Sequence, residues 1–132
     1  CSGKASLYKR NLDFLGIAMD RVEEIKLTTI DKYCSEKKID TIHYLKLDIE
    51  GNELQALQGA SEMIKNKKIA FIQFEFGGAN IDSRTFLKDF WTMFHTDYTF
   101  YRILNNGLVK IDKYRETLEI FTTINYLLEL KK

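Results

Sequence analysis

The chain has 132 residues, of which 45% are hydrophobic, and it contains nine Phe, seven Tyr and one Trp. This length supplies one compact domain with an apolar core and is too short for two. Twenty basic residues against nineteen acidic ones, spread along the chain, give a net charge of +1, so the charge balance points to neither a nucleic acid nor an anionic membrane as a partner.

The first part of the chain gives only weak indications of secondary structure. Residues 1–21 show little periodicity, and we assign no element to them. Val22–Leu27 has the composition of a strand, and Thr28 stands three residues before Asp31, the spacing of an N-terminal cap for a short helix through Lys37. We therefore treat residues 1–132 as a single domain whose α/β core occupies residues 22–132.

Cys1 and Cys34 are the two cysteines, and they lack metal-ligand spacing. We expect free thiols in a reducing compartment, although the sequence leaves a disulfide open. The sequence has no apolar run long enough to cross a bilayer and no charged-then-apolar leader at its start. These features predict a soluble, cytoplasmic protein.

Residues 44–49 predict a strand with charged side chains along one face. Alternation places Lys46, Asp48 and Glu50 on that face and apolar residues on the other. Strands of a parallel sheet are normally covered on both sides, so these charges need partners or a function. Gly51-Asn52 then ends the strand, and helical spacing predicts a helix over residues 53–65.

Residues 69–76 predict the next strand, with Gln73 and Glu75 on its more polar face. The helix between the two strands has a suitable length for a right-handed crossover, so we expect neighbouring parallel strands. Lys46 is then predicted to be buried within ion-pair reach of Glu75 or Asp48. A purely structural ion pair explains Lys46 as well as a functional role does.

The remaining helices and strands are predicted from short sequence motifs. Residues 77–82 predict a loop, and Asp82 or Ser83 can cap a helix through Phe94. Asn105-Asn106-Gly107 lies between two apolar runs, which is a strong hairpin signal, and residues 124–130 predict the last strand. The expected fold is a Rossmann-like α/β sheet, mostly parallel, with an antiparallel C-terminal hairpin.

Three segments resemble the FkbM-type methyltransferases, which use S-adenosylmethionine. The most specific is Leu45–Glu53, close to that family's Lys-x-Asp-x-Glu-Gly-x-Glu signature, together with Leu57–Ala60; the others are Thr28–Tyr33 and Phe74–Phe76. Asn125-Tyr126-Leu127 is similar to the family's last strand. The resemblance covers roughly residues 22–130, which implies the C-terminal half of the catalytic domain and a class I methyltransferase sheet.

One part of the class I pattern is missing from the sequence. Such enzymes hold the cofactor with a glycine-rich turn after their first strand and with an acidic residue that ends the second strand, and neither motif is present. We expect a truncated chain that lacks the N-terminal strands, with its cofactor-binding residues unknown. The strand over residues 44–49 should then have an open edge, through which the chain can form a homo-oligomer.

The resemblance implies O-methylation of a hydroxyl on a small polar acceptor such as a sugar. Asp48, at the end of its strand, is our candidate general base or acceptor orienter, Glu50 would assist it or contact the acceptor, and Glu75 would share the site. Asn80 and Arg84, in or just after the following loop, are candidate acceptor-binding residues. Convergent carboxylates can hold Mg²⁺, but Lys46 on the same face disfavours a metal site, and we predict none.

Two alternatives stay open at this point. The chain can be a non-catalytic α/β remnant or interaction module, which the missing glycine turn favours. It can also be a phosphate-handling domain in which Asp48 and Glu50 bind Mg²⁺. Glu53, at the start of its helix, has an ordinary explanation as a carboxylate that interacts with the helix dipole.

Overall fold

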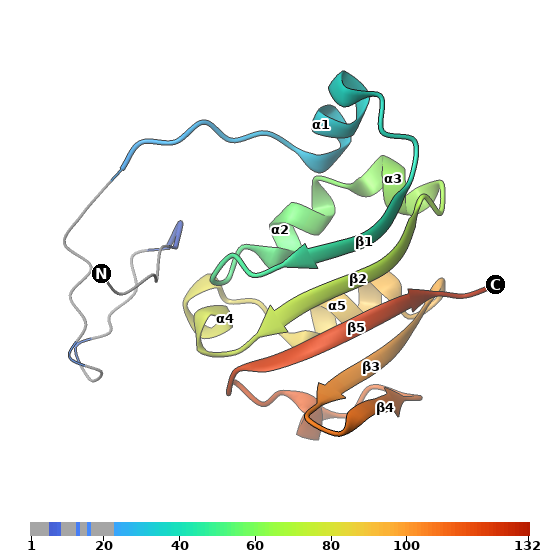
Figure 1. Cartoon of the computed structure of the whole chain (residues 1–132). Coiled ribbons are helices and arrows are strands. Elements are labelled where there is room, and N and C mark those ends of the chain that lie inside the picture. The colour runs from blue at the N-terminus through green and yellow to red at the C-terminus, as the bar shows by residue number, and fades with distance from the viewer. Residues whose placement is uncertain (1–5, 9–12, 14–15, 17–22) are drawn as a thin grey trace.

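The computed structural model describes residues 6–8, 13, 16 and 23–132, and it shows one mixed sheet with helices packed on it (Figure 1). The strands are β1 (Ile42–Leu47), β2 (Ile69–Phe76), β3 (Tyr98–Leu104), β4 (Gly107–Ile111) and β5 (Ile124–Leu130). The helices are α1 (Ile30–Lys37), α2 (Glu53–Gln58), α3 (Ser61–Lys65), α4 (Gly78–Ser83), α5 (Leu87–Phe94) and the 3-10 helix η2 (Glu116–Leu118). None of the helices in these ranges has the length and apolar character of a membrane span.

The predicted parallel pair is confirmed. β1 and β2 are adjacent and parallel, with Tyr44 opposite Phe71 and Leu47 opposite Phe74. The crossover contains two short helices, α2 and α3, where the sequence predicted one helix. They are separated at Gly59, where a Cβ would lie 3.3 Å from the Cβ of Thr29, so the absence of a side chain lets the start of α1 approach closely.

The prediction of a mostly parallel sheet is wrong. The strand order is β1-β2-β5-β3-β4, and only the first of these four pairings is parallel. The reason is that β5, the last strand in sequence, inserts between β2 and β3 and runs antiparallel to both. The α/β class, the hairpin between β3 and β4, and the strand over residues 124–130 are confirmed.

The helices α2, α3 and α5 lie behind the sheet in the view of Figure 1, and they enclose the core on that side. Phe74 of β2 stacks on Phe90 of α5 with ring centroids 4.2 Å apart, and both side chains are fully buried. In the described part of the chain, no helix covers the opposite, near face of the sheet. Side chains on that face are therefore more exposed than the sequence predicted.

Several predicted caps and boundaries need correction at the start of the chain. Residues 23–27 form no strand and are exposed, and Val22 lies outside the described residues. Thr29, not Thr28, caps α1 by accepting a hydrogen bond from the backbone N–H of Lys32 at 3.2 Å. The Asp31 carboxylate instead accepts hydrogen bonds from the first N–H groups of α3, which ties α1 to the crossover.

The segment after β2 also differs from the prediction. Residues expected to form a loop belong in part to α4, and the following helix, α5, begins at Leu87. Neither Asp82 nor Ser83 caps α5. Its first free N–H group, that of Leu87, donates to the Glu119 carboxylate at 2.8 Å, so a residue far along the chain does what a local cap usually does.

β1 forms the edge of the sheet among the described strands, because β2 is its one neighbour. Tyr44 on this strand is 51% exposed, and Leu27 in the preceding segment is 72% exposed. The predicted open edge is thus present in the described residues, while the predicted homo-oligomer remains a prediction.

Candidate functional site

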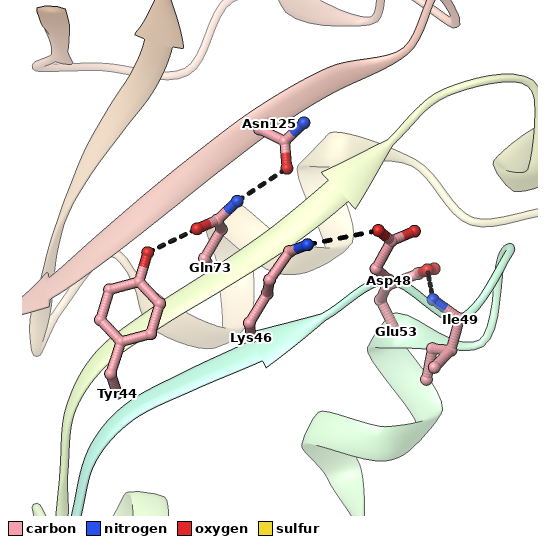
Figure 2. A network of polar contacts seen from close by, with 7 residues as sticks. All are labelled: Tyr44, Lys46, Asp48, Ile49, Glu53, Gln73 and Asn125. Carbon is pink, nitrogen blue, oxygen red and sulfur yellow. Dashed lines mark hydrogen bonds and ion pairs between the residues drawn. The ribbon is translucent and has the colours of Figure 1, made fainter.

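The turn that follows β1 is held by a buried carboxylate. Glu53, the first residue of α2, is only 1% exposed. Its side chain accepts a hydrogen bond from the N–H of Ile49 at 2.9 Å (Figure 2) and another from the N–H of Gly51 at 3.0 Å. Glu53 therefore fixes the turn that presents Asp48 and Glu50. The sequence predicted only a helix-dipole role for this residue, because the return of its side chain to the preceding turn depends on the three-dimensional course of the chain.

The same turn packs tightly against the start of α4, the helix that follows β2. Gly51 has a φ of +101°, and a Cβ there would lie 2.8 Å from the carbonyl oxygen of Ala79. Glu50 is also left-handed, with a φ of 51°, a conformation that costs a residue with a side chain about 1–2 kcal/mol. The close approach holds the turn after β1 against the start of α4, beside the carboxyl end of β2.

Lys46 and Asp48 form an ion pair on the uncovered face of the sheet. The Lys46 Nζ and Asp48 Oδ2 atoms are 3.4 Å apart (Figure 2), and the two side chains are 55% and 50% exposed. The predicted pairing is confirmed, and the predicted burial of Lys46 is wrong because no described helix covers this face. Such an exposed pair contributes at most about 1 kcal/mol to stability, so stability alone does not explain these charges.

Glu75 is the carboxyl group whose environment perturbs its ionisation most clearly. Its partial burial raises its pKa, and the negative charges of Asp48, Glu50 and Glu53 raise it further, while Lys46 lowers it. The charges of Asp48 and Glu50, the other two predicted catalytic carboxylates, therefore act on Glu75 electrostatically. Their role in catalysis remains a prediction.

A chain of hydrogen bonds crosses three strands beside these carboxylates. The Tyr44 hydroxyl donates to the Gln73 Oε1 atom, and the Gln73 Nε2 group donates to the Asn125 Oδ1 atom at 2.9 Å (Figure 2). Asn125 is in turn the cross-strand partner of Glu75. The alternation of β2 placed Gln73 on this face in the sequence, but the contribution of Asn125 could not be predicted because it requires β5 to lie next to β2.

The two predicted acceptor-binding residues have different environments. Asn80 is 2% exposed and its Oδ1 atom accepts a hydrogen bond from the N–H of Gly77 at 2.8 Å. Its Nδ2 group is buried without a hydrogen-bond partner in the described part of the chain, so one donor remains available. Arg84 is exposed and ends α4 in a left-handed conformation. The structure thus places Asn80 in the protein interior and Arg84 at its surface.

The residues of this site do not form an obvious cradle for a nucleoside cofactor. The N–H groups of the turn after β1 are already bonded to Glu53, and the space beside Gly51 is filled by the backbone of Ala79. Within the described ranges, no group of three or more His, Cys, Asp or Glu side chains is placed to hold a metal ion. What the arrangement offers is carboxylates and amides that can bind and orient hydroxyl groups.

Comparison with protein families supplies the remaining evidence. The model of the methyltransferase FkbM domain matches residues 12–102, which include β1, β2 and the carboxylates at their ends. Comparison with the curated proteins found no match, and comparison with the solved structures found none either. Since the matched residues make up well over half of the sequence, the chain belongs to the FkbM methyltransferase domain family.

Proposed function

We propose that this chain forms the acceptor side of an S-adenosylmethionine-dependent O-methyltransferase that acts on a hydroxyl group of a sugar or similar small polar molecule. The observation that carries the proposal is the convergence of Asp48 and Glu75 at the carboxyl ends of two adjacent parallel strands. Ligands of open α/β sheets bind at that edge. The family match covers both residues and supports the reaction type.

The chemistry divides between the cofactor and the protein. When bound, the cofactor supplies an electrophilic methyl group. The chain's own task is to orient the acceptor hydroxyl and to take its proton. Glu75 suits proton transfer because its raised pKa lies closer to neutral pH than that of an ordinary carboxyl group. Asp48, next to the Lys46 ammonium, suits hydrogen bonding to the hydroxyl, and Glu50 assists from the adjoining turn.

We propose that the cofactor is not held by these 132 residues alone. The sequence contains no glycine-rich turn after an early strand, and the N–H groups of Ile49 and Gly51, in the turn after β1, are already bonded to Glu53. The same observation favours the second candidate function, a non-catalytic interaction module that keeps the α/β scaffold. The two candidates differ in one respect: only the first needs Asp48 and Glu75 as carboxylates.

The experiment has two parts. Calorimetric titration of S-adenosylmethionine into the 132-residue chain should show no binding in the micromolar range, and micromolar affinity would contradict the assignment of cofactor binding to other residues. Transfer of a labelled methyl group to sugars is then measured with a protein that joins residues 1–132 to a cofactor-binding half. Transfer that Glu75→Gln abolishes supports the enzyme, whereas bound cofactor without transfer to any acceptor supports the interaction module.

A further inference from the structure

A polar groove of about 640 Å³ lies where β3 ends and β5 begins. Ligand sites in proteins commonly have volumes of roughly 300–1,000 Å³, so a molecule of the size of a monosaccharide fits. Four amides and one hydroxyl group contribute to its lining: Gln73, Asn105, Asn106, Asn125 and Thr123. Because amides are neutral and both donate and accept hydrogen bonds, these side chains suit the hydroxyl groups of a ligand.

The amides of β2 and β5 lie on the same, uncovered face of the sheet as Glu75. Asn125 is opposite Glu75 in the pairing of these strands, and Gln73 precedes Glu75 by two residues. The charged residue of the lining, Arg102, is opposite Tyr126, which stacks on Phe74 on the helix-covered face. Arg102 therefore directs its side chain to the other face, and among the described residues the uncovered face adds only neutral side chains to the groove.

The candidate site needs a hydrogen-bond donor that its carboxylates do not supply. An ionised carboxylate only accepts hydrogen bonds, whereas a hydroxyl group has one proton to give and an oxygen that accepts. Holding that oxygen in place therefore requires a donor beside the carboxylate that takes the proton. The Lys46 ammonium group is one donor in this region, but it is paired with Asp48.

Asn125 presents a second donor, and this one is not committed. Its Oδ1 atom accepts a hydrogen bond from the Gln73 Nε2 group at 2.9 Å, and Gln73 accepts in turn from the Tyr44 hydroxyl (Figure 2). The Asn125 Nδ2 group is thus turned away from Gln73, and it has no acceptor in the described part of the chain. Residues directly opposite in antiparallel strands have Cβ atoms about 4.5–5.5 Å apart, so one ligand hydroxyl can contact both Asn125 and Glu75.

We propose that the Asn125 Nδ2 group holds the oxygen of the reacting hydroxyl, and that the acceptor is an uncharged sugar whose other hydroxyl groups bind the groove amides. The hydroxyl oxygen forms a bond to the methyl group as the C–S bond breaks toward sulfur, and its proton passes to the Glu75 carboxylate. Tyr44 and Gln73 are positioning residues, because they act on the acceptor only through the Asn125 amide. This inference rests on the proposed function and adds to it the acceptor class and the donor.

The acceptor class is tested by methyl transfer in the protein that joins residues 1–132 to a cofactor-binding half. Acceptors are offered in pairs that differ in one charge: D-glucose and D-glucuronate, D-galactose and D-galacturonate, D-mannose and D-mannuronate. We expect the neutral sugar of a methylated pair to have a kcat/KM higher by about tenfold or more, because a carboxylate in the groove finds no cation. An acidic sugar that is methylated as well as its neutral partner would overturn the acceptor class.

The donor is tested with Asn125→Asp, which keeps the shape of the side chain and an oxygen for Gln73 but replaces the donor by an acceptor. With the best neutral sugar, we expect kcat to fall by about tenfold, as for loss of one hydrogen bond, with cofactor affinity unchanged. Asn66→Asp is the matched control, because Asn66 is exposed at the end of α3, and it should leave kcat unchanged. Undiminished kcat in Asn125→Asp would contradict the proposal.

Tyr44→Phe separates positioning from a structural role. It should lower kcat by about two- to tenfold, but it should have no further effect in a protein that already carries Asn125→Ala, because Tyr44 acts through Asn125. Tyr101→Phe removes a hydroxyl that donates to Glu129 at 3.0 Å on the same face, and it should leave kcat unchanged. An equal loss from Tyr44→Phe in both backgrounds refutes the positioning role. If Asn125→Asp fails to fold, unchanged kcat in Tyr44→Phe alone contradicts the proposal.

Failure of this inference differs from failure of the proposed function. Bound cofactor without transfer to any sugar refutes the proposed function, and the role of Asn125 falls with it. Transfer by the wild type that persists undiminished in Asn125→Asp refutes the role of Asn125 and leaves the proposed function in place.

Discussion

Gly51 is the residue at which the turn after β1 touches the start of α4. A Cβ at this position would lie 2.8 Å from the Ala79 carbonyl oxygen and would also be strained by a φ of +101°. We expect Gly51→Ala to lower the free energy of unfolding by about 2–4 kcal/mol, since strain and overpacking each cost about 1–3 kcal/mol. Urea unfolding followed by circular dichroism measures this.

Gly107 is the matched control, because it also has a positive φ, +138°, but has no atom within 4 Å of the position of a Cβ. Gly107→Ala should therefore cost only the strain. Equal losses at the two positions would contradict the role of Gly51 in close packing of the turn after β1 against the start of α4.

Glu53 holds the turn after β1 by accepting hydrogen bonds from the Ile49 and Gly51 N–H groups, and its replacement should lower stability. Glu53→Gln keeps the shape of the side chain, but its uncharged amide has one acceptor oxygen in place of the two that now accept from the Ile49 and Gly51 N–H groups, and we expect a loss of about 1–3 kcal/mol. Glu62, an exposed first-turn residue of α3, is the control for the helix dipole, which is worth about 0.3–1 kcal/mol. If Glu62→Gln costs as much in chemical denaturation, Glu53 has only the dipole role.

Glu75 should make stability depend on pH in a defined direction. Its pKa is raised above 4.5 in the folded protein, chiefly by burial, so the folded state holds the proton more tightly than the unfolded state. The favourable contribution is complete below pH 4.5 and is lost as pH rises through the raised pKa. Glu75→Gln should therefore gain stability relative to the wild type between pH 4 and pH 7. A relative loss over this range in thermal unfolding would refute the assigned shift.

At the scale of elements, the sequence predicted those features of the fold that depend on residues close together in the chain. The β1–β2 crossover followed from two apolar runs joined by a helix of the right length, and the β3–β4 hairpin followed from Asn105-Asn106-Gly107. The helix break at Gly59 depends on contact with Thr29, and the capping of α5 depends on Glu119. Both arise from residues distant in sequence, so local patterns could not predict them.

The edge position of β1 has a measurable consequence. β2 and β5 have neighbours on both sides, whereas β1 has one described neighbour. We expect the outward-facing amides of β1, about half of its N–H groups, to exchange with deuterium within minutes, while those of β2 and β5 remain protected. Equal protection of all amides in the three strands would mean that another segment or chain pairs with β1.

At the scale of the whole molecule, the α/β class of the fold was predictable, but the relative directions of the strands in its sheet were not. The insertion of β5 between β2 and β3 makes most pairings antiparallel, and long-range strand order leaves no local trace in sequence. The same limit applies to the site. Asp48, Glu50 and Glu75 follow from strand alternation, but Asn125 reaches the site region only through the pairing of β5 with β2. The prediction that Lys46 is buried was wrong, because the sequence alone did not show that one face of the sheet is uncovered.

The central claim is that the carboxylates at the ends of β1 and β2 serve methyl transfer. The most direct measurement is the kcat of Asp48→Asn in a protein that joins residues 1–132 to a cofactor-binding half, with cofactor affinity measured in parallel. We expect kcat to fall by about 10²-fold or more, because the acceptor hydroxyl that Asp48 orients would be misplaced, while cofactor affinity stays unchanged. An Asp48→Asn variant with undiminished kcat and normal cofactor binding would contradict the claim.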